Sequence, residues 1–515
     1  MTEPGRPNFL IVMADQLVPS ALPFHGNSVT QAPAMTELAE SGVVFDSAYT
    51  PSPLCAPARA SLMTGLLPSN THAYDNAAEF SSEIPTFAHY LRRAGYRTVL
   101  SGKMHFCGSD QMHGFEERLT TDIYPADYGW TPDWDKPEDR PHWYHDMSSV
   151  TDAGPCIRSN QLDFDDEVGF AAERELFRHI RSNDERPFCF VVSFTHPHDP
   201  YAIPARWWDL YDDEDIPLPD FGYDEQLAHP HERRLRQVCA MDDVEISAEQ
   251  VRAARHAYYG AISYVDDRVG RLIDVLRDTG RLDDTVVILT SDHGDMLGER
   301  GLWYKMSFFE GSARVPLVVS APSRFSPRRV SAPVSTMDLL PTLVGLAADG
   351  DLSGVIGPID GESLLPLLAG EPHARDTVTA EYLAEGAVAP IVMIRRGSVK
   401  LIHSPADPDQ LYDLATDPLE RNNLTEDPDY LDVLSDLRAE VAARWDLVTI
   451  DREVRASQHR RAAVVEALGT GIEAAWDFTP PYDASRRYIR NHMDLGELEK
   501  MARYPPTSGV VGTDP

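Results

Sequence analysis

Short apolar runs that lead directly into side chains capable of chemistry limit what this chain can fold into. An apolar run without polar alternation is typical of a parallel strand that is buried on both faces. The runs are residues 8–14, 187–194 and 285–289, which lead to Asp15, His198 and Asp292, respectively; a further predicted strand, residues 96–100, leads to Lys103. In α/β folds, functional side chains lie just beyond the carboxyl ends of such strands. We therefore expect a functional site at one edge of a sheet.

Helical patterns alternate with these strands and determine the expected fold class. Residues 248–279, for example, place Val265, Val269 and Leu272 at helical spacing. Alternating strands and helices predict an α/β protein with a large doubly wound sheet, mixed or parallel, that is flanked by helices. Residues 205–247 are acidic and contain prolines, so we expect a surface excursion there.

The pattern changes near residue 375. Short strand-like segments with tight links predict a small antiparallel sheet, and helical stretches follow; these are residues 391–395, 399–402 and 410–414, then 431–445 and 455–468. From about residue 475 the chain is polar, rich in Pro and Tyr, and too extended to fold alone. We expect a large α/β domain over 1–374, a small C-terminal α+β subdomain over 375–450, and a helix with an extended tail over 451–515 that lies on another surface, such as a neighbouring subunit.

Composition narrows the class of function. The chain has 82 acidic and 46 basic residues, a formal net charge of -36, which argues against nucleic acid because its phosphates would be repelled. The charge is compatible with a cationic substrate, and equally with a salty cytoplasm. No run approaches the roughly 18 apolar residues of a membrane span, and the N-terminus lacks the features of a signal peptide. The five widely spaced cysteines indicate neither a disulfide framework nor a zinc cluster, so we expect a cytoplasmic protein.

Asp15, Asp292 and His293 are the strand-end residues best suited to hold a metal ion. Two carboxylates form an oxygen-rich site that suits a hard divalent cation, and a nitrogen ligand softens it. Strand-end aspartates are also common helix caps, so the residues by themselves leave both interpretations open.

The stretch Cys55-Ala56-Pro57-Ala58-Arg59, followed by Leu62-Met63-Thr64-Gly65, resembles the C-x-P-x-R signature of sulfatases. A helix is expected to begin near Pro57 or Ala58. Further stretches resemble other signatures of that family: Gly102-Lys103-Met104-His105, Pro197-His198-Asp199-Pro200, Asp292-His293-Gly294-Asp295, and Lys305 followed by Glu310-Gly311-Ser312-Ala313-Arg314-Val315-Pro316. Residues 1–374 would then be the sulfatase catalytic domain.

The resemblance implies that Cys55 is oxidised to formylglycine by a formylglycine-generating enzyme, and that the hydrated aldehyde is the nucleophile. It also implies a metal ion held by Asp15, Cys55, Asp292 and His293, with Ca²⁺ the first choice and Mg²⁺ or Mn²⁺ open. Two positions depart from the common family pattern. Ala14 stands where many sulfatases have a second aspartate, and His293 stands where many have asparagine.

The resemblance gives the remaining residues their roles. Arg59 would hold the hydrated aldehyde, Lys103 would neutralise the sulfate, and His105 would take a proton from the hydrate. His198 would protonate the leaving oxygen, and Lys305 would be a second sulfate donor. One hydroxyl of the hydrate attacks sulfur and expels the alcohol. Loss of the proton from the other hydroxyl then lets the sulfated residue expel sulfate and restore the aldehyde. Because serine lacks that second path, cysteine at position 55 favours a sulfatase over a relative of the alkaline-phosphatase type.

Longer stretches resemble the choline-sulfatase branch of the family. They are residues 52–59, 74–79, 113–127 and 194–201, together with Arg490-Asn491-His492-Met493 in the tail. The implied substrate is choline-O-sulfate, whose trimethylammonium head requires aromatic faces and a carboxylate. Positions that match choline-binding residues are Asn76, Trp130, His145 and Glu385, with Asp494, or second Glu497, supplied by the tail of a partner subunit. The branch thus implies a homo-oligomer, either a tetramer or a dimer of dimers.

Two alternatives remain. The same scaffold could serve an aryl sulfatase or a phosphonate monoester or phosphodiester hydrolase. A catalytically silent binding protein, in which Cys55 stays a thiol, is the alternative from another class.

Overall fold

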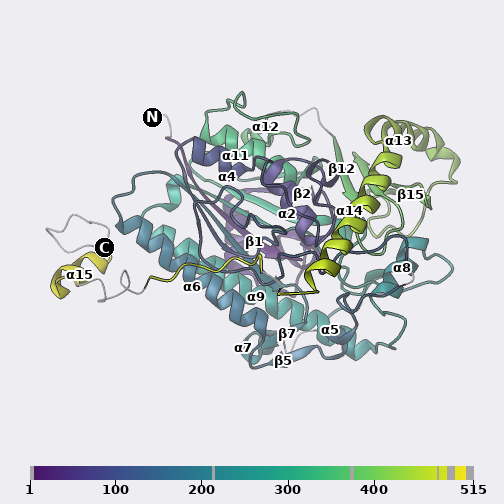
Figure 1. Cartoon of the computed structure of the whole chain (residues 1–515), viewed down its shortest axis with the longest axis horizontal. Helices are drawn as coiled ribbons and strands as arrows, with labels where there is room; N and C mark the ends of the chain where they lie inside the picture. The colour runs from purple at the N-terminus through teal and green to yellow at the C-terminus, as the bar shows by residue number, and fades with distance from the viewer. Residues whose placement is uncertain are drawn as a thin grey trace.

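The protein is described from a computed structural model, which covers residues 5–137, 139–211, 215–371, 376–472, 475–483 and 493–505. Figure 1 shows a large twisted sheet between layers of helices, with a separate small sheet from the C-terminal part of the chain. The predicted fold class is confirmed.

Within the described residues, the large sheet has nine strands in the order β10-β2-β9-β8-β1-β6-β3-β4, with β11 also paired to β2. The strands are β1 Asn8–Asp15, β2 Val43–Tyr49, β3 Arg97–Gly102, β4 Glu117–Arg118, β6 Phe188–Pro197, β8 Thr285–Thr290, β9 Arg314–Ser320, β10 Arg328–Val330 and β11 Val334–Ser335. β9 runs antiparallel to β8 and β2. The sheet is therefore mixed, with a parallel block around β1.

Successive side chains of β1 enter two different hydrophobic cores, because a strand points alternate residues to opposite faces. Leu10 and Val12 pack into one core, whereas Phe9, Ile11 and Met13 pack into the other. Figure 1 shows α6 and α9 across one face of the sheet, and α4 and α11 on the other. The flanking helices are α1 Pro33–Ser41, α2 Cys55–Thr64, α4 Phe87–Arg93, α6 Asn160–Arg181, α9 Ala248–Asp278, α11 Leu339–Ala347 and α12 Leu365–Ala369.

The second sheet is antiparallel, in the order β12-β13-β14-β15. Its strands are β12 Thr377–Tyr382, β13 Ile391–Arg396, β14 Val399–Ser404 and β15 Asp407–Asp413. α13 (Leu431–Arg444) packs on β13 and β14. α14 (Leu447–Leu468) then runs back along the body of the molecule, as Figure 1 shows in yellow-green. The exact domain limits at residues 374 and 450 stay predictions.

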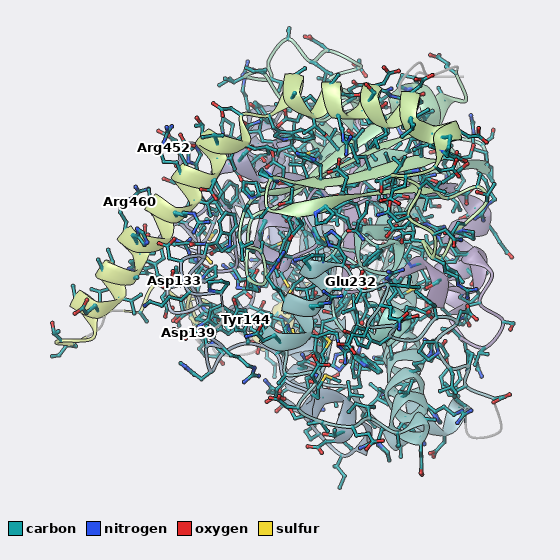
Figure 2. The ribbon with its side chains drawn as sticks, turned by 90° about the vertical axis from the view of Figure 1, so that its right-hand side faces the viewer. Asp133, Asp139, Tyr144, Glu232, Arg452 and Arg460 are labelled. Atoms are coloured by element: carbon teal, nitrogen blue, oxygen red, sulfur yellow. The ribbon has the colours of Figure 1, made fainter. Side chains whose placement is uncertain are left out.

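The structure differs from the sequence-based expectations in several local elements. β12 was not predicted, and α14 begins before the expected residue 455. The region 205–247 is more than a surface excursion, because α8 (Pro230–Val238) buries Glu232 and Leu235. Glu232 is 3% exposed and pairs with Arg300 at 3.2 Å, which explains how an acidic side chain can enter the interior. Figure 2 labels Glu232 on this helix. The remaining short elements are α3 Pro68–Thr71, α5 Ser148–Thr151, β5 Gly154–Cys156, α7 Ala205–Trp208, β7 Ala202–Pro204 and α10 Glu310–Ala313.

The C-terminal tail is described over residues 475–483 and 493–505, which include α15 (Leu495–Ala502). The predicted motif at Arg490, Asn491 and His492 lies outside the described residues. None of the helices in the described ranges has the length and apolar character needed to cross a bilayer.

Candidate active site

The carboxyl ends of adjacent strands bring the predicted side chains together. β8, β1, β6 and β3 are neighbours in the sheet, and Asp15 lies in register with Pro197. Asp292 follows β8, Lys103 follows β3, and His198 follows Pro197 at the end of β6. These residues therefore meet at the sheet edge that the apolar runs predicted.

Gly102 allows β3 to deliver Lys103 to this edge. Its φ is 105°, and a Cβ at this position would lie 2.0 Å from the carbonyl oxygen of Ser193. Glycine is the residue that adopts this backbone without a clash. The next backbone N–H, that of Lys103, donates to the same Ser193 carbonyl at 3.0 Å.

Cys55 is the first residue of α2, a helix that is buried along its whole length. Pro57 fits in the first turn because those N–H groups have no acceptor inside the helix. The expected start at Pro57 or Ala58 was thus slightly late. Gly65, with φ 69°, ends the helix and donates to the Ser61 carbonyl. Cys55 therefore lies at the positive end of the helix dipole, which favours an anion beside it.

Asp15, Cys55, Asp292 and His293 form a compact buried cluster, with one potential ligand atom from each lying within 4.8 Å of the others. Cys55 Sγ lies 3.2 Å from His293 Nε2, which is 3.7 Å from a carboxylate oxygen of each aspartate. His293 Nδ1 donates to the Gly294 carbonyl at 3.0 Å, so Nε2 presents its lone pair to the cluster. Asp15 Oδ1 is buried without a hydrogen-bond partner in the described residues. This donor set fits a divalent cation.

Two buried cations balance the cluster. Arg59 Nε donates to Asp292 at 2.8 Å, and Lys103 Nζ contacts Asp15 and lies 3.5 Å from Cys55 Sγ. Burial alone would raise the pKa of Asp15, but Lys103 and Arg59 hold that pKa well below its usual range. Burial would also raise the pKa of Asp292, but Arg59, together with His293 and Lys103, holds that pKa below its usual value. Both carboxylates therefore stay ionised, as metal ligation requires.

Lys305 contacts two of the site's histidines, His198 and His145, through its ammonium group. Its Nζ lies 2.7 Å from His198 Nε2 and 3.2 Å from His145 Nε2. His198 Nδ1 donates to the Asp199 carbonyl at 2.7 Å, so its Nε2 accepts from Lys305. Burial and the Lys305 charge hold the pKa of His198 well below its usual value. The imidazole is therefore neutral and shares a proton of Lys305.

Gln16 is a site residue that sequence reasoning missed. Its Oε1 accepts from Lys305 Nζ at 2.9 Å, and its Nε2 donates to Asp295 at 2.7 Å. Both contacts are buried, so the amide orients the Lys305 ammonium. The signal in the sequence was its place directly after Asp15 at a strand end.

An aromatic wall, formed by the rings of Tyr124, Trp130 and Trp143, lies beside the cluster. Tyr124 and Trp130 have ring centroids 5.2 Å apart, and the Trp130 ring is stacked on that of Trp143 at 6.2 Å. Lys103 Nζ lies 4.3 Å from the Tyr124 ring centroid. The wall thus has π-faces in direct contact with the cationic side of the site. Trp130, predicted from the sequence, is part of it.

His105 packs into the same wall, with its ring 5.1 Å from that of Tyr124. Neither ring nitrogen has a hydrogen-bond partner in the described residues. Its backbone is left-handed, with φ 53°, and Asp122 Oδ2 accepts from the N–H groups of Met104 and His105 at 3.0 and 2.9 Å. Asp122 was not identified from the sequence, although it lies in the stretch 113–127 that carries the resemblance.

Asn76 and Glu385 flank the site on other segments. Asn76 Oδ1 accepts from the N–H of Ala56, next to Cys55, at 3.0 Å. Glu385 is 4% exposed, and its Oε2 has no partner in the described part of the chain. It lines a small cavity with Tyr144, whose ring lies 4.5 Å from that of Trp143. Burial raises the pKa of Glu385 to about 7.

Asp494 lies apart from the other predicted residues. It caps α15, where its side chain accepts from Glu497 N. Figure 1 shows α15 beyond the end of α6, well away from α2. Within one chain Asp494 is therefore remote from the cluster, and its assignment to a partner's pocket stays a prediction.

Comparison with known families matches this architecture. The Sulfatase family model matches residues 7–349. A model described as Choline sulfatase enzyme C terminal matches residues 452–504, and one described as N-sulphoglucosamine sulphohydrolase, C-terminal, matches residues 298–445.

Individual relatives cover nearly the whole chain. A choline-sulfatase of Rhizobium meliloti is 50% identical over 514 residues, which cover 97% of this chain and 99% of the relative. An arylsulfatase of Clostridium perfringens is 26% identical, over 84% of this chain and 93% of the relative. The solved phosphonate monoester hydrolase of Agrobacterium radiobacter superposes with a TM-score of 0.69 at 26% identity, over 88% of this chain and 96% of that one. The chain therefore belongs to the sulfatase family, whose members hydrolyse sulfate esters.

Proposed function

We propose that this protein hydrolyses choline-O-sulfate to choline and sulfate, and that residue 55 acts as a formylglycine. The observation that carries the proposal is the buried cluster of Asp15, Cys55, Asp292 and His293 beside an aromatic wall. The 50% identity to a choline-sulfatase over 97% of the chain supports the choice of ester.

The nucleophile would come from the modified side chain of residue 55, whose hydrated aldehyde supplies an oxygen for attack on sulfur. A divalent cation held by Asp15, Asp292 and His293, with Ca²⁺ preferred to Mg²⁺ or Mn²⁺, would supply positive charge that favours this oxygen as an anion. Arg59 and Lys103 add fixed cations at the same place and thereby stabilise charge that develops on the sulfate oxygens. Because both are buried, they need no reorganisation during the reaction.

The leaving alcohol requires a proton, and the Lys305–His198 pair can deliver it. The Lys305 ammonium donates to His198 Nε2. Transfer of that proton to His198 Nε2, displacement of the Lys305 amine from this nitrogen by the ester oxygen, and transfer of the proton from Nε2 to that oxygen leave Lys305 neutral and release choline with its hydroxyl formed. Gln16 orients the ammonium before this transfer.

The choline head would lie against Trp130 and His145, with Glu385 as the counter-charge. The head is a cation without hydrogen-bond donors, and aromatic faces with a carboxylate are the groups that bind it. Glu385 is suited to this because its Oε2 is buried without a partner in the described residues.

Substrate comparison tests the proposal against its main alternatives. Sulfate or phosphonate release should be measured with choline sulfate, 4-nitrophenyl sulfate and a phenyl phosphonate monoester. We expect the highest kcat/KM with choline sulfate. The structural likeness to a phosphonate monoester hydrolase makes the phosphonate ester the second candidate, and a higher kcat/KM on either of the other compounds would overturn the choice of choline sulfate.

Replacing His198 should separate substrates by their leaving groups. In His198→Ala, kcat for choline sulfate is expected to fall by about 10²- to 10⁴-fold, the usual contribution of a general acid. 4-Nitrophenyl sulfate has a leaving group that needs little protonation, so its kcat should fall much less. The check is steady-state kinetics on both esters, and equal losses on both would argue against proton delivery by His198.

Glu385 should make choline recognition pH-dependent. With a pKa of about 7, its carboxylate is ionised above that pH and neutral below it. KM for choline sulfate should therefore rise as the pH falls through 7, whereas KM for 4-nitrophenyl sulfate should not follow. Glu385→Gln should raise KM for choline sulfate about tenfold at pH 8, equivalent to about 1.4 kcal/mol, and remove this pH dependence. A variant with the parent's KM and pH profile would refute the role.

Maturation by a formylglycine-generating enzyme, a tetramer or dimer of dimers and a cytoplasmic location belong to the same proposal. They rest on the resemblance and on the sequence features described above.

A further inference from the structure

One face of α14 enters the body of the molecule while the rest of the helix is exposed. The buried residues of its middle are Val454, Gln458 and Arg461. Figure 2 shows Arg452 and Arg460 on the outer side of the same helix. Arg460 and Arg461 are thus adjacent arginines with opposite environments, the first exposed and the second 5% exposed.

Arg461 makes a two-pronged ion pair with a distant acid. Its Nη1 and Nη2 each donate to one oxygen of Asp75 at 2.7 Å. Asp75 is fully buried, and its Oδ1 also accepts from the N–H of Ala77 at 3.0 Å. A fork of this kind fixes both the position and the plane of a carboxylate. Arg461 therefore holds the turn that contains Asp75.

That turn supports the segment around residue 55. Asn76 follows Asp75, and its Oδ1 accepts from the N–H of Ala56 at 3.0 Å. On its other side, the Asn76 carbonyl accepts from Cys107 Sγ at 3.1 Å. The route from Arg461 to the backbone beside Cys55 thus consists of two side-chain contacts and one peptide bond.

Arg461 also reaches the aromatic wall. Its Nη1 donates to Thr131 Oγ1 at 3.0 Å, directly after Trp130 in the chain. One helical turn earlier, Gln458 Oε1 accepts from the N–H of Trp134 at 3.0 Å. The segment 130–134 is therefore attached to α14 at two points, and Figure 2 shows its Asp133 beside that helix.

We propose that Arg461 is a positioning residue. It holds two segments in a fixed position relative to each other: the turn at Asp75, which supports the backbone beside residue 55, and the segment 130–134 of the aromatic wall. Neither Arg461 nor Asp75 needs to touch substrate for this role. Arg461 lies within the segment matched by the choline-sulfatase C-terminal model. That segment would thus contribute to alignment inside its own subunit. The inference rests on the proposed function, because it assigns the segment around residue 55 to the sulfate end of the substrate and the aromatic wall to its choline end.

The test compares Arg461→Met with Arg460→Met, which makes the same substitution on the exposed side of α14. Arg461→Lys is the conservative variant, since one ammonium can pair with Asp75 but cannot bridge both of its oxygens and Thr131. Each full-length protein is assayed with choline sulfate and 4-nitrophenyl sulfate, well below its measured Tm. Far-UV circular dichroism confirms that each variant is folded.

We expect kcat to fall about 10- to 100-fold in Arg461→Met on both esters, the usual loss when a supporting partner is removed. KM should rise for choline sulfate only, because the displaced wall serves the choline head. Arg461→Lys should recover part of kcat, and Arg460→Met should match the parent. A purely structural role predicts a lower Tm with kcat and KM of the folded protein unchanged, and that result would overturn the inference.

The test also gives an answer if Arg461→Met does not fold, or if the parent does not hydrolyse choline sulfate. If Arg461→Met does not fold, Arg461→Lys becomes the test variant. A kcat of Arg461→Lys equal to that of Arg460→Met would then refute the positioning role. If the parent hydrolyses 4-nitrophenyl sulfate but not choline sulfate, the choice of ester fails. The kcat comparison on 4-nitrophenyl sulfate then still tests Arg461.

Discussion

Cys55→Ala is expected to abolish sulfate release from choline sulfate, with a loss of about 10⁴- to 10⁶-fold in kcat, as when other covalent nucleophiles are removed. Cys55 is the first residue of α2, and its Sγ lies within 3.5 Å of both His293 Nε2 and Lys103 Nζ. An alanine therefore removes the atom that these two groups contact. Ion chromatography of released sulfate measures the effect without a coloured leaving group.

Cys55→Ser tests the role of the second hydroxyl more specifically than Cys55→Ala does. A serine keeps an oxygen nucleophile but lacks the second hydroxyl of a hydrated aldehyde, so we expect sulfated enzyme to accumulate without turnover. Cys156→Ala, at a half-buried cysteine outside the cluster, is the matched control and should retain activity. A Cys55→Ala protein that works at the parent's rate would refute the nucleophile assignment.

Asp292→Asn should lower activity more than about 100-fold, because losing a metal ligand costs more than losing a supporting partner of one. Removing this carboxylate also leaves Arg59 without its 2.8 Å partner in the interior. We expect the variant to contain less divalent metal after purification, measured by inductively coupled plasma mass spectrometry. The parent should lose activity in a chelator and regain it with Ca²⁺, Mg²⁺ or Mn²⁺.

Asp432→Asn is the control for this prediction, because Asp432 is an exposed carboxylate of α13 outside the cluster. It should keep both its metal content and its activity. Full activity in chelator-treated, metal-free protein would contradict the metal site, whatever the behaviour of Asp292→Asn.

The apolar runs made the large sheet predictable, because burial on both faces leaves little freedom in sequence. β1 shows this most clearly, since its two faces enter two cores and its end delivers Asp15. The region of α8 was harder to predict. The ion-pair partner of its buried Glu232 is Arg300, and a pairing between residues so far apart in the sequence leaves no local signal. β12 was also missed, although it pairs with β13, the next strand in the chain.

The site residues at strand ends could be predicted because topology alone brings them together. Asp122 and Arg461 could not, because their importance depends on contacts between different segments of the chain, and the only signal for Gln16 was its place directly after Asp15. Asp122 matters through the N–H groups that it accepts from Met104 and His105. The tail residue Asp494 is a different case, since its proposed contact requires a second subunit.

Mass spectrometry of the peptide that carries residue 55, taken from enzyme that turns over choline sulfate, tests the central claim most directly. The account predicts an aldehyde in place of the thiol, trapped by a hydrazine reagent, and activity in proportion to the converted fraction. Fully active enzyme whose peptide contains only unmodified cysteine would contradict it.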